Sequence, residues 1–228
     1  MKKRAAKAQS AEQPTEPPLG SVLTPYQQAL RDRMLAAPVL PAPEPWRPVF
    51  ASCAPVGGLL GIGFATHPDS HPDSGNGRGN DSGNDLVMVV SHDGHGLFDA
   101  VTGEKIARER DPDSEDATPD STADLTCPGL GPIAGTRVRI AGLYGGGLHL
   151  TAFGGWGLEV VHPVWPHERV LLTHGSGMPH REPHGEGWWH IFNSHYSELR
   201  TVGFSPSGHT LAVATSSDLT LWTRAGRR

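Results

Sequence analysis

A pattern that occurs three times constrains the fold of this chain more than any other feature. Each copy has an apolar run, a short polar turn and a second apolar run. The copies span 86–99, 147–158 and 210–222. The leucines that align them, Leu97, Leu158 and Leu221, are 61 and 63 residues apart. Two apolar runs joined by a tight polar turn are typical of a β-hairpin, and their recurrence indicates a repeated architecture.

Further apolar runs extend each hairpin into a larger unit. A strand is predicted before each hairpin, at 58–65, 138–144 and 199–206. A fourth strand is predicted after the first two hairpins, at 104–108 and 169–173. No room for a fourth strand remains after the third hairpin, and Val49-Phe50-Ala51 near the start is a candidate for it. Four antiparallel strands per unit are the plan of a propeller blade. We therefore predict an all-β fold of three four-stranded antiparallel blade-like sheets, as a partial or small β-propeller.

The third unit resembles a WD40 repeat in its residues. Its first strand ends in Phe204-Ser205-Pro206-Ser207-Gly208, a Ser217-Asp218 turn follows, and the last strand closes with Trp222. The first unit is similar to the second half of such a repeat, with Phe98 in the position of the tryptophan. The unit spacing exceeds the ~40–45 residues usual for this family, and three units are fewer than the usual four to eight blades. The resemblance implies a rigid platform for protein–protein contact without catalytic residues. An open partial propeller and one completed by a second chain are both compatible with it.

The segment before the repeats predicts a short helix behind a disordered tail. Residues 1–22 are basic, polar and proline-rich, which is typical of disorder. A helix is predicted over 24–37, because Thr24 and Gln27 form a capping box and Pro25 suits the first helical position. We expect its apolar stripe to pack on the β domain, with contact to a partner as the alternative. Residues 1–40 are thus assigned to the tail and helix, and residues 41–228 to the β domain.

Three polar segments interrupt the β domain, and each is predicted to be a mobile loop. Residues 66–85 contain a repeated His-Pro-Asp-Ser and a Gly/Asn run where the third unit has only a short turn. Residues 109–124 contain seven acidic residues, which predicts a solvated connector. Residues 174–197 are rich in histidine, glycine and tryptophan and connect the second and third units.

Charge and cysteine content exclude several classes of protein. A net charge of -5 and a pI of about 6.2 argue against a nucleic-acid or anionic-membrane surface. No apolar run approaches the length of a membrane span, and no apolar segment follows the basic start, so we expect a cytoplasmic protein. Cys53 and Cys127 form no CxxC motif. Two reduced, buried thiols are expected, with one disulfide as the alternative.

Catalytic motifs are absent, but histidines concentrate in one segment. Seven of the 13 histidines lie between His162 and His195. His180 and His184 have the spacing of two metal ligands on a helix, yet the prolines and glycines around them disfavour a helix there. No HExxH, Gly-x-Ser-x-Gly or phosphate-binding loop occurs. No catalytic, cofactor-binding or metal-binding residue is therefore predicted, and a polar loop is the favoured interpretation.

The adjacent tryptophans of the same segment give the candidate contact site. Neighbouring residues of a strand point to opposite faces, so Trp188 and Trp189 are not expected to be buried together. The four residues assigned to partner binding are Trp188, Trp189, His184 and His190.

Three functions are compatible with these observations. A non-catalytic protein–protein interaction module with an unidentified protein partner is the first. A metal-dependent or small-molecule enzyme that uses the histidines of 174–195 is the second. The third is a structural subunit that completes its fold on assembly, for example as a homo-oligomer, because exposed sheet edges favour pairing.

Overall fold

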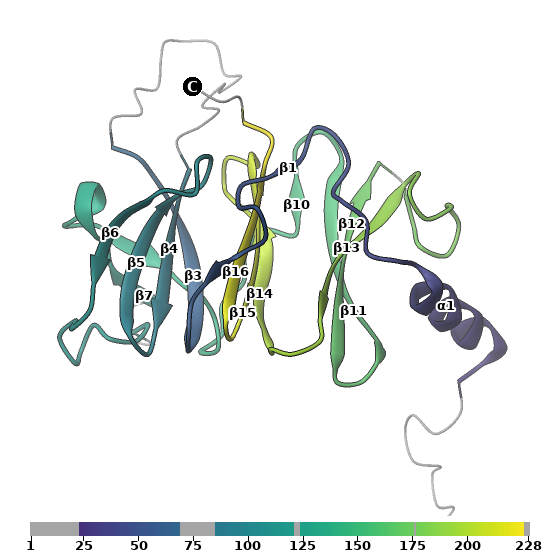
Figure 1. The fold of residues 1–228 in the computed structure, drawn as a ribbon, viewed down its shortest axis with the longest axis horizontal. Helices are drawn as coiled ribbons and strands as arrows, with labels where there is room; N and C mark the ends of the chain where they lie inside the picture. Colours follow the sequence, from purple (N-terminus) through teal and green to yellow (C-terminus); the bar gives the residue numbers. More distant parts are fainter. Residues whose placement is uncertain (1–22, 69–84, 121–123, 176, 226–228) are drawn as a thin grey trace, which may run out of the picture.

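The structure is a computed structural model that describes residues 23–68, 85–120, 124–175 and 177–225. Strands predominate, and they form several antiparallel sheets, none of which closes on itself. Among the described residues one α-helix, α1 (Pro25–Ala36), precedes the strands. Figure 1 shows three larger sheets side by side, with α1 beyond the last of them.

The first sheet follows the predicted first unit. Its strands lie in the order β6-β5-β4-β3-β9, so four consecutive strands form a meander. The bounds are β3 (Leu59–Thr66), β4 (Asp85–Ser91), β5 (Gly94–Asp99), β6 (Lys105–Glu109) and β9 (Ala141–Gly142). The four strands predicted for this unit are confirmed. Most of loop 66–85 lies outside the described residues.

The third sheet combines the end of the chain with its beginning. It contains β14 (Leu199–Phe204), β15 (Thr210–Thr215), β16 (Asp218–Thr223), β1 (Arg47–Pro48) and β2 (Ala54–Pro55). β1 pairs with β16 and completes a four-stranded path. The Val49 N–H also donates to the Leu221 carbonyl at 2.9 Å. The early segment does complete this sheet, but the paired strand is Arg47–Pro48 and not the predicted Val49-Phe50-Ala51, of which Val49 alone bonds to β16.

The second sheet differs from its prediction by one strand. It contains β10 (Thr151–Ala152), β11 (Trp156–Val164), β12 (His167–His174) and β13 (Trp188–Ser194) in that order. The hairpin predicted at 147–158 therefore forms the first two strands of this sheet. The strand predicted at 169–173 is the third strand. The fourth strand comes from 188–194, which we had wrongly assigned to a loop because its tryptophans follow a run of glycine and proline.

The prediction of a strand at 138–144 for the second unit is also wrong. This segment is divided between β8 (Arg137–Arg139), which pairs with β7 (Thr126–Pro128), and β9, which pairs with β3. The 3-10 helix η1 (Gly131–Ile133) lies between β7 and β8. Val138 and Ile140 are buried against Leu60 and Met88 of the first sheet. Their apolar side chains thus cover the outer face of that sheet.

The sheets stack face to face, with the third sheet in the middle. One core cluster joins the third sheet to the second and contains Trp46, Leu172 and Phe204. Another joins the third sheet to the first. Because the side chains of a strand alternate between faces, Leu211 enters the first of these clusters and Ala212 the second. Both faces of the third sheet are therefore buried.

Helix α1 begins as predicted and packs weakly. The Thr24 side chain accepts from the Gln27 N–H, the Gln27 side chain completes the capping box, and Pro25 occupies the first turn. No residue of the helix is buried, and Tyr26 is 62% exposed. Met34 packs against a small cluster on the outer face of the second sheet. The expected contact with the β domain thus involves the end of the helix more than its whole stripe.

Two further features concern the cysteines and possible membrane spans. Cys53 and Cys127 are both free thiols, the first half-buried and the second buried. Burial raises the pKa of Cys127 to about 11.

Within the described part of the chain, no helix has the length and apolar character needed to cross a membrane.

Candidate functional site

Two of the four residues assigned to partner binding are buried. Trp188 is fully buried and His190 is 1% exposed, and both belong to β13. Trp189 and His184 are half-buried, and Trp189 packs against the core shared with the third sheet. The two adjacent tryptophans therefore point to opposite faces of the sheet, and both faces are occupied. In this conformation Trp188 and His190 cannot contact a partner.

Main-chain carbonyl groups at the end of α1 hold the buried pair in place. His190 Nδ1 lies 3.0 Å from the Ala37 carbonyl, and the Leu40 N–H donates to the His190 carbonyl at 2.8 Å. The Trp188 Nε1–H donates to the Glu182 carbonyl at 2.8 Å. Arg169 donates to the carbonyl groups of Met34 and Ala37. These bonds fasten the N-terminal segment over β12 and β13.

The surroundings of the two histidines of this contact lower the pKa of both rings. His184 Nε2 accepts from the His190 N–H at 3.2 Å, so it carries no proton. Burial lowers the pKa of His190, with smaller lowering contributions from Arg169 and His184, although its bond to Ala37 opposes the shift. Burial also lowers the pKa of His184. Both groups therefore serve the docking of the N-terminal segment.

The most exposed aromatic side chains lie elsewhere on the second sheet. Trp165 is 81% exposed, and Tyr196 is fully exposed. Trp165 lies in the turn between β11 and β12, and Tyr196 lies between β13 and β14. With Val164, His167 and His195 they form what we call the aromatic surface. Large exposed aromatic side chains are informative because folding alone would bury them.

The two turns of the aromatic surface are tied together by one carboxylate. Glu168 Oε2 accepts from the Leu199 N–H at 3.1 Å, and Glu168 Oε1 lies 3.0 Å from His162 Nε2. The His167 and His195 rings meet at 5.6 Å between their centres. This carboxylate therefore joins the β11–β12 turn to the chain that enters β14.

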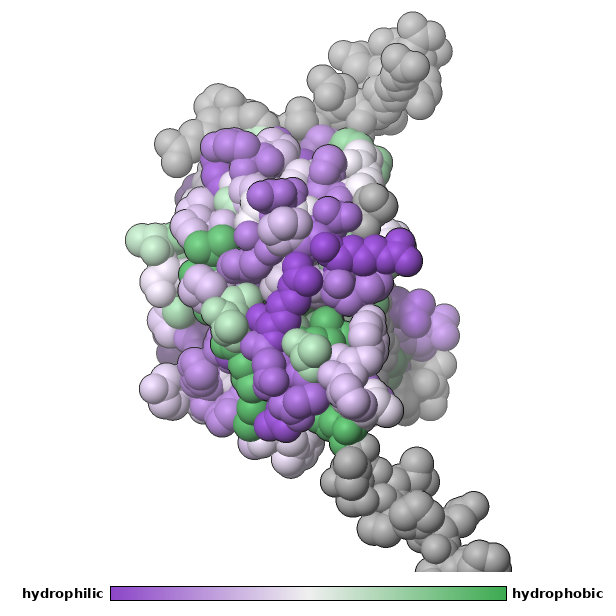
Figure 2. Space-filling model, turned by 90° about the vertical axis from the view of Figure 1, so that its right-hand side faces the viewer, coloured by the Kyte–Doolittle hydropathy of each residue, from purple (hydrophilic) through white to green (hydrophobic). Residues whose placement is uncertain are grey.

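A hollow of about 460 Å³ lies between these turns, with Trp165, His195, Tyr196 and Leu199 among its lining residues. This volume is within the range of small-ligand sites. Glu198 is the second carboxylate of the hollow, and it pairs with Arg200 at 2.9 Å. Apart from these carboxylates the lining is largely aromatic and apolar, with Trp165, Tyr196 and Leu199, so the hollow suits an apolar group. Figure 2 looks at the end of the molecule near α1, where apolar patches lie among predominantly hydrophilic residues.

The histidine-rich segment does not assemble a metal site in the part of the chain that is described. No three His, Cys, Asp or Glu side chains of those residues come close enough to hold a metal ion. His180 lies in a turn and His184 forms an isolated β-bridge with Trp188, so neither lies on a helix. The spacing that suggested metal ligands therefore has no structural support there.

The chain was also compared with known proteins. No family model, curated protein or solved structure matches it. The candidate site therefore depends on its own geometry.

The structure exposes Trp165 and buries Trp188, whereas the candidate contact site was predicted at Trp188 and Trp189. Trp165 stands before a proline between two predicted strands, which places an aromatic side chain in a turn. A tryptophan before a proline is thus the sequence signal that points to an exposed aromatic side chain at this position. Tyr196 had no such signal, since the strand before it was itself assigned to a loop.

Proposed function

We propose that this protein is a non-catalytic protein-interaction module built on a propeller-like β domain, and that the aromatic surface contacts its partner. The observation that carries the proposal is the exposure of Trp165 and Tyr196 beside one hollow. Tryptophan and tyrosine are enriched among the residues that dominate binding energy at interfaces. Each buries about 150–250 Å² when it is covered.

The propeller-like description draws on the order of the strands. The first and second sheets each contain a four-stranded meander, and in the third sheet β1 from the start of the chain adds to the three-stranded meander β14-β15-β16. The sheets also pack face to face through shared cores. These features, together with the residues that resemble a WD40 repeat, support a platform that presents its turns to a partner.

The hollow indicates what kind of partner segment fits. Aromatic-lined grooves bind extended, proline-containing peptides, which lose little conformational entropy on binding. The carboxylates of Glu168 and Glu198 would repel an acidic ligand group, and the rest of the lining is largely aromatic and apolar. We propose an extended, uncharged segment of the partner as the occupant.

The oligomeric alternative has lost its main motivation. It was based on an unpaired last hairpin, but β1 and β2 pair with β16. The enzymatic alternative was based on the histidines of 174–195, which form no cluster of metal ligands among the described residues.

The proposal is tested by removing the aromatic side chains. A Trp165→Ala/Tyr196→Ala variant of the full chain is compared with the wild type in partner capture from native lysate, followed by measurement of affinity for the purified partner. A Tyr26→Ala/Tyr144→Ala variant is the matched control, because both tyrosines are exposed and lie outside the aromatic surface. We expect the first variant to lose at least about tenfold in affinity and the control to bind like the wild type. Equal binding by all three proteins would contradict the proposal, and a partner that is a second copy of the chain would revive the oligomeric alternative.

A further inference from the structure

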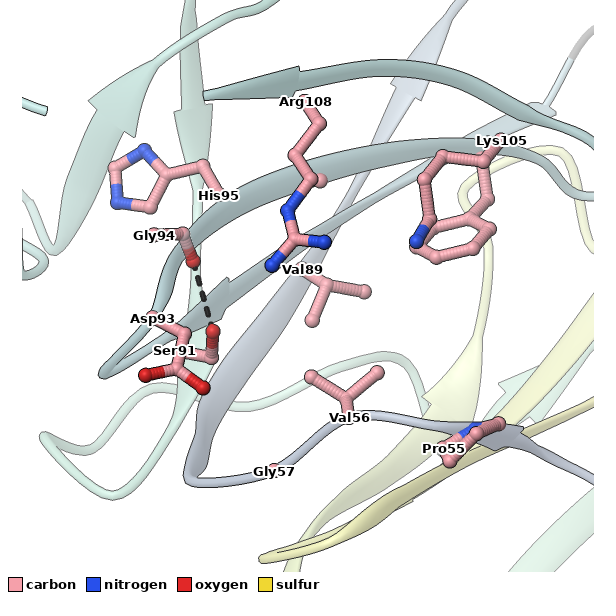
Figure 3. Close-up of a pocket in the computed structure, with 12 residues that line it drawn as sticks. Pro55, Val56, Gly57, Val89, Ser91, Asp93, Gly94, His95, Lys105 and Arg108 are labelled. Carbon is pink, nitrogen blue, oxygen red and sulfur yellow. Dashed lines mark hydrogen bonds between the residues drawn. The ribbon is translucent and has the colours of Figure 1, made fainter. Parts of the chain in front are cut away.

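A second hollow, of about 100 Å³, lies on the face of the first sheet that turns toward the third sheet. β4, β5 and β6 form one side of it, and the loop after β2 forms the other (Figure 3). Whole small-molecule ligands occupy pockets of about 300–1,000 Å³. This hollow is therefore matched to a single functional group of a ligand.

A β-bulge places two cationic side chains on the same side of this hollow. Lys105 pairs with Phe98 and Arg108 pairs with Gly96, with a register shift between these pairs. In a regular strand, residues three apart point to opposite faces. The extra residue in β6 re-aims one of them, as bulges commonly do near functional sites. Lys105 and Arg108 thus both face the hollow.

The absence of a side chain at Gly96 creates the space. Gly96 lies opposite both Val89 and Arg108 in the sheet. A Cβ atom there would lie 3.3 Å from Cε2 of Phe98, so any larger side chain would fill the floor. Figure 3 shows the Arg108 guanidinium directed into this space above Val89.

The charges in the hollow are unevenly distributed. No described residue forms an ion pair with Lys105 or Arg108. The Lys105 ammonium lies 5.2 Å from the centre of the Phe98 ring, which holds it at the rim. Asp93 lies at the opposite end, and the His95 ring points away from the space (Figure 3). Two cations without an ion-pair partner among the described residues, against the single carboxylate of Asp93, give the lining of this hollow a positive balance in a chain of net charge -5.

We propose that this hollow binds the oxyanion of a phosphate monoester or of inorganic phosphate. A phosphate monoester carries about -1.5 to -2 charges at neutral pH, which matches the two cations. The guanidinium offers two parallel N–H donors to phosphate oxygens, and the ammonium adds a point charge. Asp93 is placed to receive a hydrogen-bond donor from the rest of a larger ligand. This site is separate from the aromatic surface and does not depend on the proposed partner.

The test is a titration of the ¹⁵N-labelled full chain with sodium phosphate at constant pH and ionic strength. We expect saturable shifts of the Gly94 and Gly96 amide signals. Arg108→Gln is expected to weaken binding at least about tenfold, because it removes charge-assisted hydrogen bonds. Arg110→Gln is the matched control. It removes the same charge two residues further along the chain, and the Arg110 side chain does not line the hollow. Non-saturable shifts, or equal weakening by both variants, would overturn the proposal.

A second variant separates the space from the charge. Gly96→Val fills the floor and keeps both cations, so we expect it to abolish binding of phosphate. Should its circular dichroism show misfolding, Lys105→Gln replaces it, with the same direction of effect expected. Unchanged binding by a folded Gly96→Val protein would contradict the assignment.

A further titration with phosphoethanolamine distinguishes free phosphate from a phosphoryl group of a larger ligand. Tighter binding than phosphate, with the gain lost in Asp93→Asn, would assign the site to the larger ligand. Equal affinity would assign it to the oxyanion alone.

Discussion

The third and second sheets have the same four-stranded plan but different surroundings. In the third sheet, every residue of β15 is buried, because the first sheet covers one face and the second sheet covers the other. The second sheet has one face in the shared core, whereas its outer face meets only the end of α1 and a few neighbouring residues. Its turns carry the bare Trp165 and Tyr196.

This difference gives the two sheets different roles: the middle sheet stabilises the stack, and the sheet at the end of the stack is accessible to a partner. Side chains of β15 are inaccessible and can act only by fixing the positions of the neighbouring sheets. Side chains at the ends of the second sheet are held by that packing but remain accessible. Binding capacity is therefore expected at the end of the stack, with stability concentrated in its middle.

The largest expected effect comes from the middle of the stack. Phe204→Ala removes a fully buried ring that lies 5.5 Å from the Trp46 ring, and the cavity should lower the free energy of unfolding by about 3–5 kcal/mol. Trp165→Ala removes an exposed ring and should change it by less than about 0.5 kcal/mol. Urea denaturation of both variants measures the contrast, and similar losses would show that the two regions do not differ as described.

The next largest effect concerns the bond between the first and third sheets. The buried Asp85 carboxylate accepts from Ser207 at 2.6 Å and from Thr210 at 2.8 Å. Asp85→Ala leaves two hydroxyl groups without this acceptor and should lower the free energy of unfolding by about 1–3 kcal/mol. The exposed Asp93→Ala is the control in the same urea experiment. A loss below 0.5 kcal/mol for Asp85→Ala would mean that this bond is not important for the stack.

Acidification should loosen the second sheet at its contact with the N-terminal segment. Burial lowers the pKa of His184 and His190, so the unfolded chain binds more protons than the folded one below the ordinary value of 6.5. Stability from these groups is thus present above that pH and is lost as the pH falls toward their folded pKa values. Burial lowers the pKa of His209 as well, with Arg224 contributing, so the third sheet shares the direction of this effect.

Hydrogen exchange at pH 7 and pH 5 measures where the loosening begins. We expect the amide of Leu40, which is bonded to the His190 carbonyl, to lose protection before the amides of β15. His167→Gln, at an exposed position, is the control and should leave this order unchanged. Simultaneous loss at both places would indicate one cooperative unit instead of a weakly attached segment.

The smallest effect is expected at the helix start. Thr24→Ala removes the capping box and should destabilise α1 by about 1 kcal/mol, while global unfolding stays unchanged because no residue of the helix is buried. Faster exchange of the Gln27 and Gln28 amides, with an unaltered urea midpoint, is the predicted result. A shifted midpoint would show that α1 contributes to the stability of the whole domain.

The sequence predicted the parts of the fold that local patterns determine. The capping residues of α1, the strands β3 to β6 of the first sheet and the strands β14 to β16 of the third sheet lie at nearly the predicted positions. The strands predicted for the second sheet began one strand too early. Val138 and Ile140 have the pattern of a strand of that unit, but they pack on the first sheet. Their destination depends on long-range packing, which a local pattern does not contain.

The candidate site was harder to predict for a related reason. Trp188 and Trp165 are the same residue type in the same sheet, yet one is fully buried and the other 81% exposed. Trp188 is covered partly by Ala37, some 150 residues earlier in the chain, and partly by the neighbouring His184 and Glu182. Its burial therefore depends in part on the docking of a distant segment, which residue type and local spacing do not reveal.

Hydrogen exchange of the full chain with and without its purified partner tests the central claim most directly. The account predicts new protection at 162–168 and 194–199, which carry Trp165 and Tyr196, with none at 182–190. Protection confined to 182–190 and to α1 would place the partner at the buried tryptophan, and would contradict the assignment of contact to the aromatic surface.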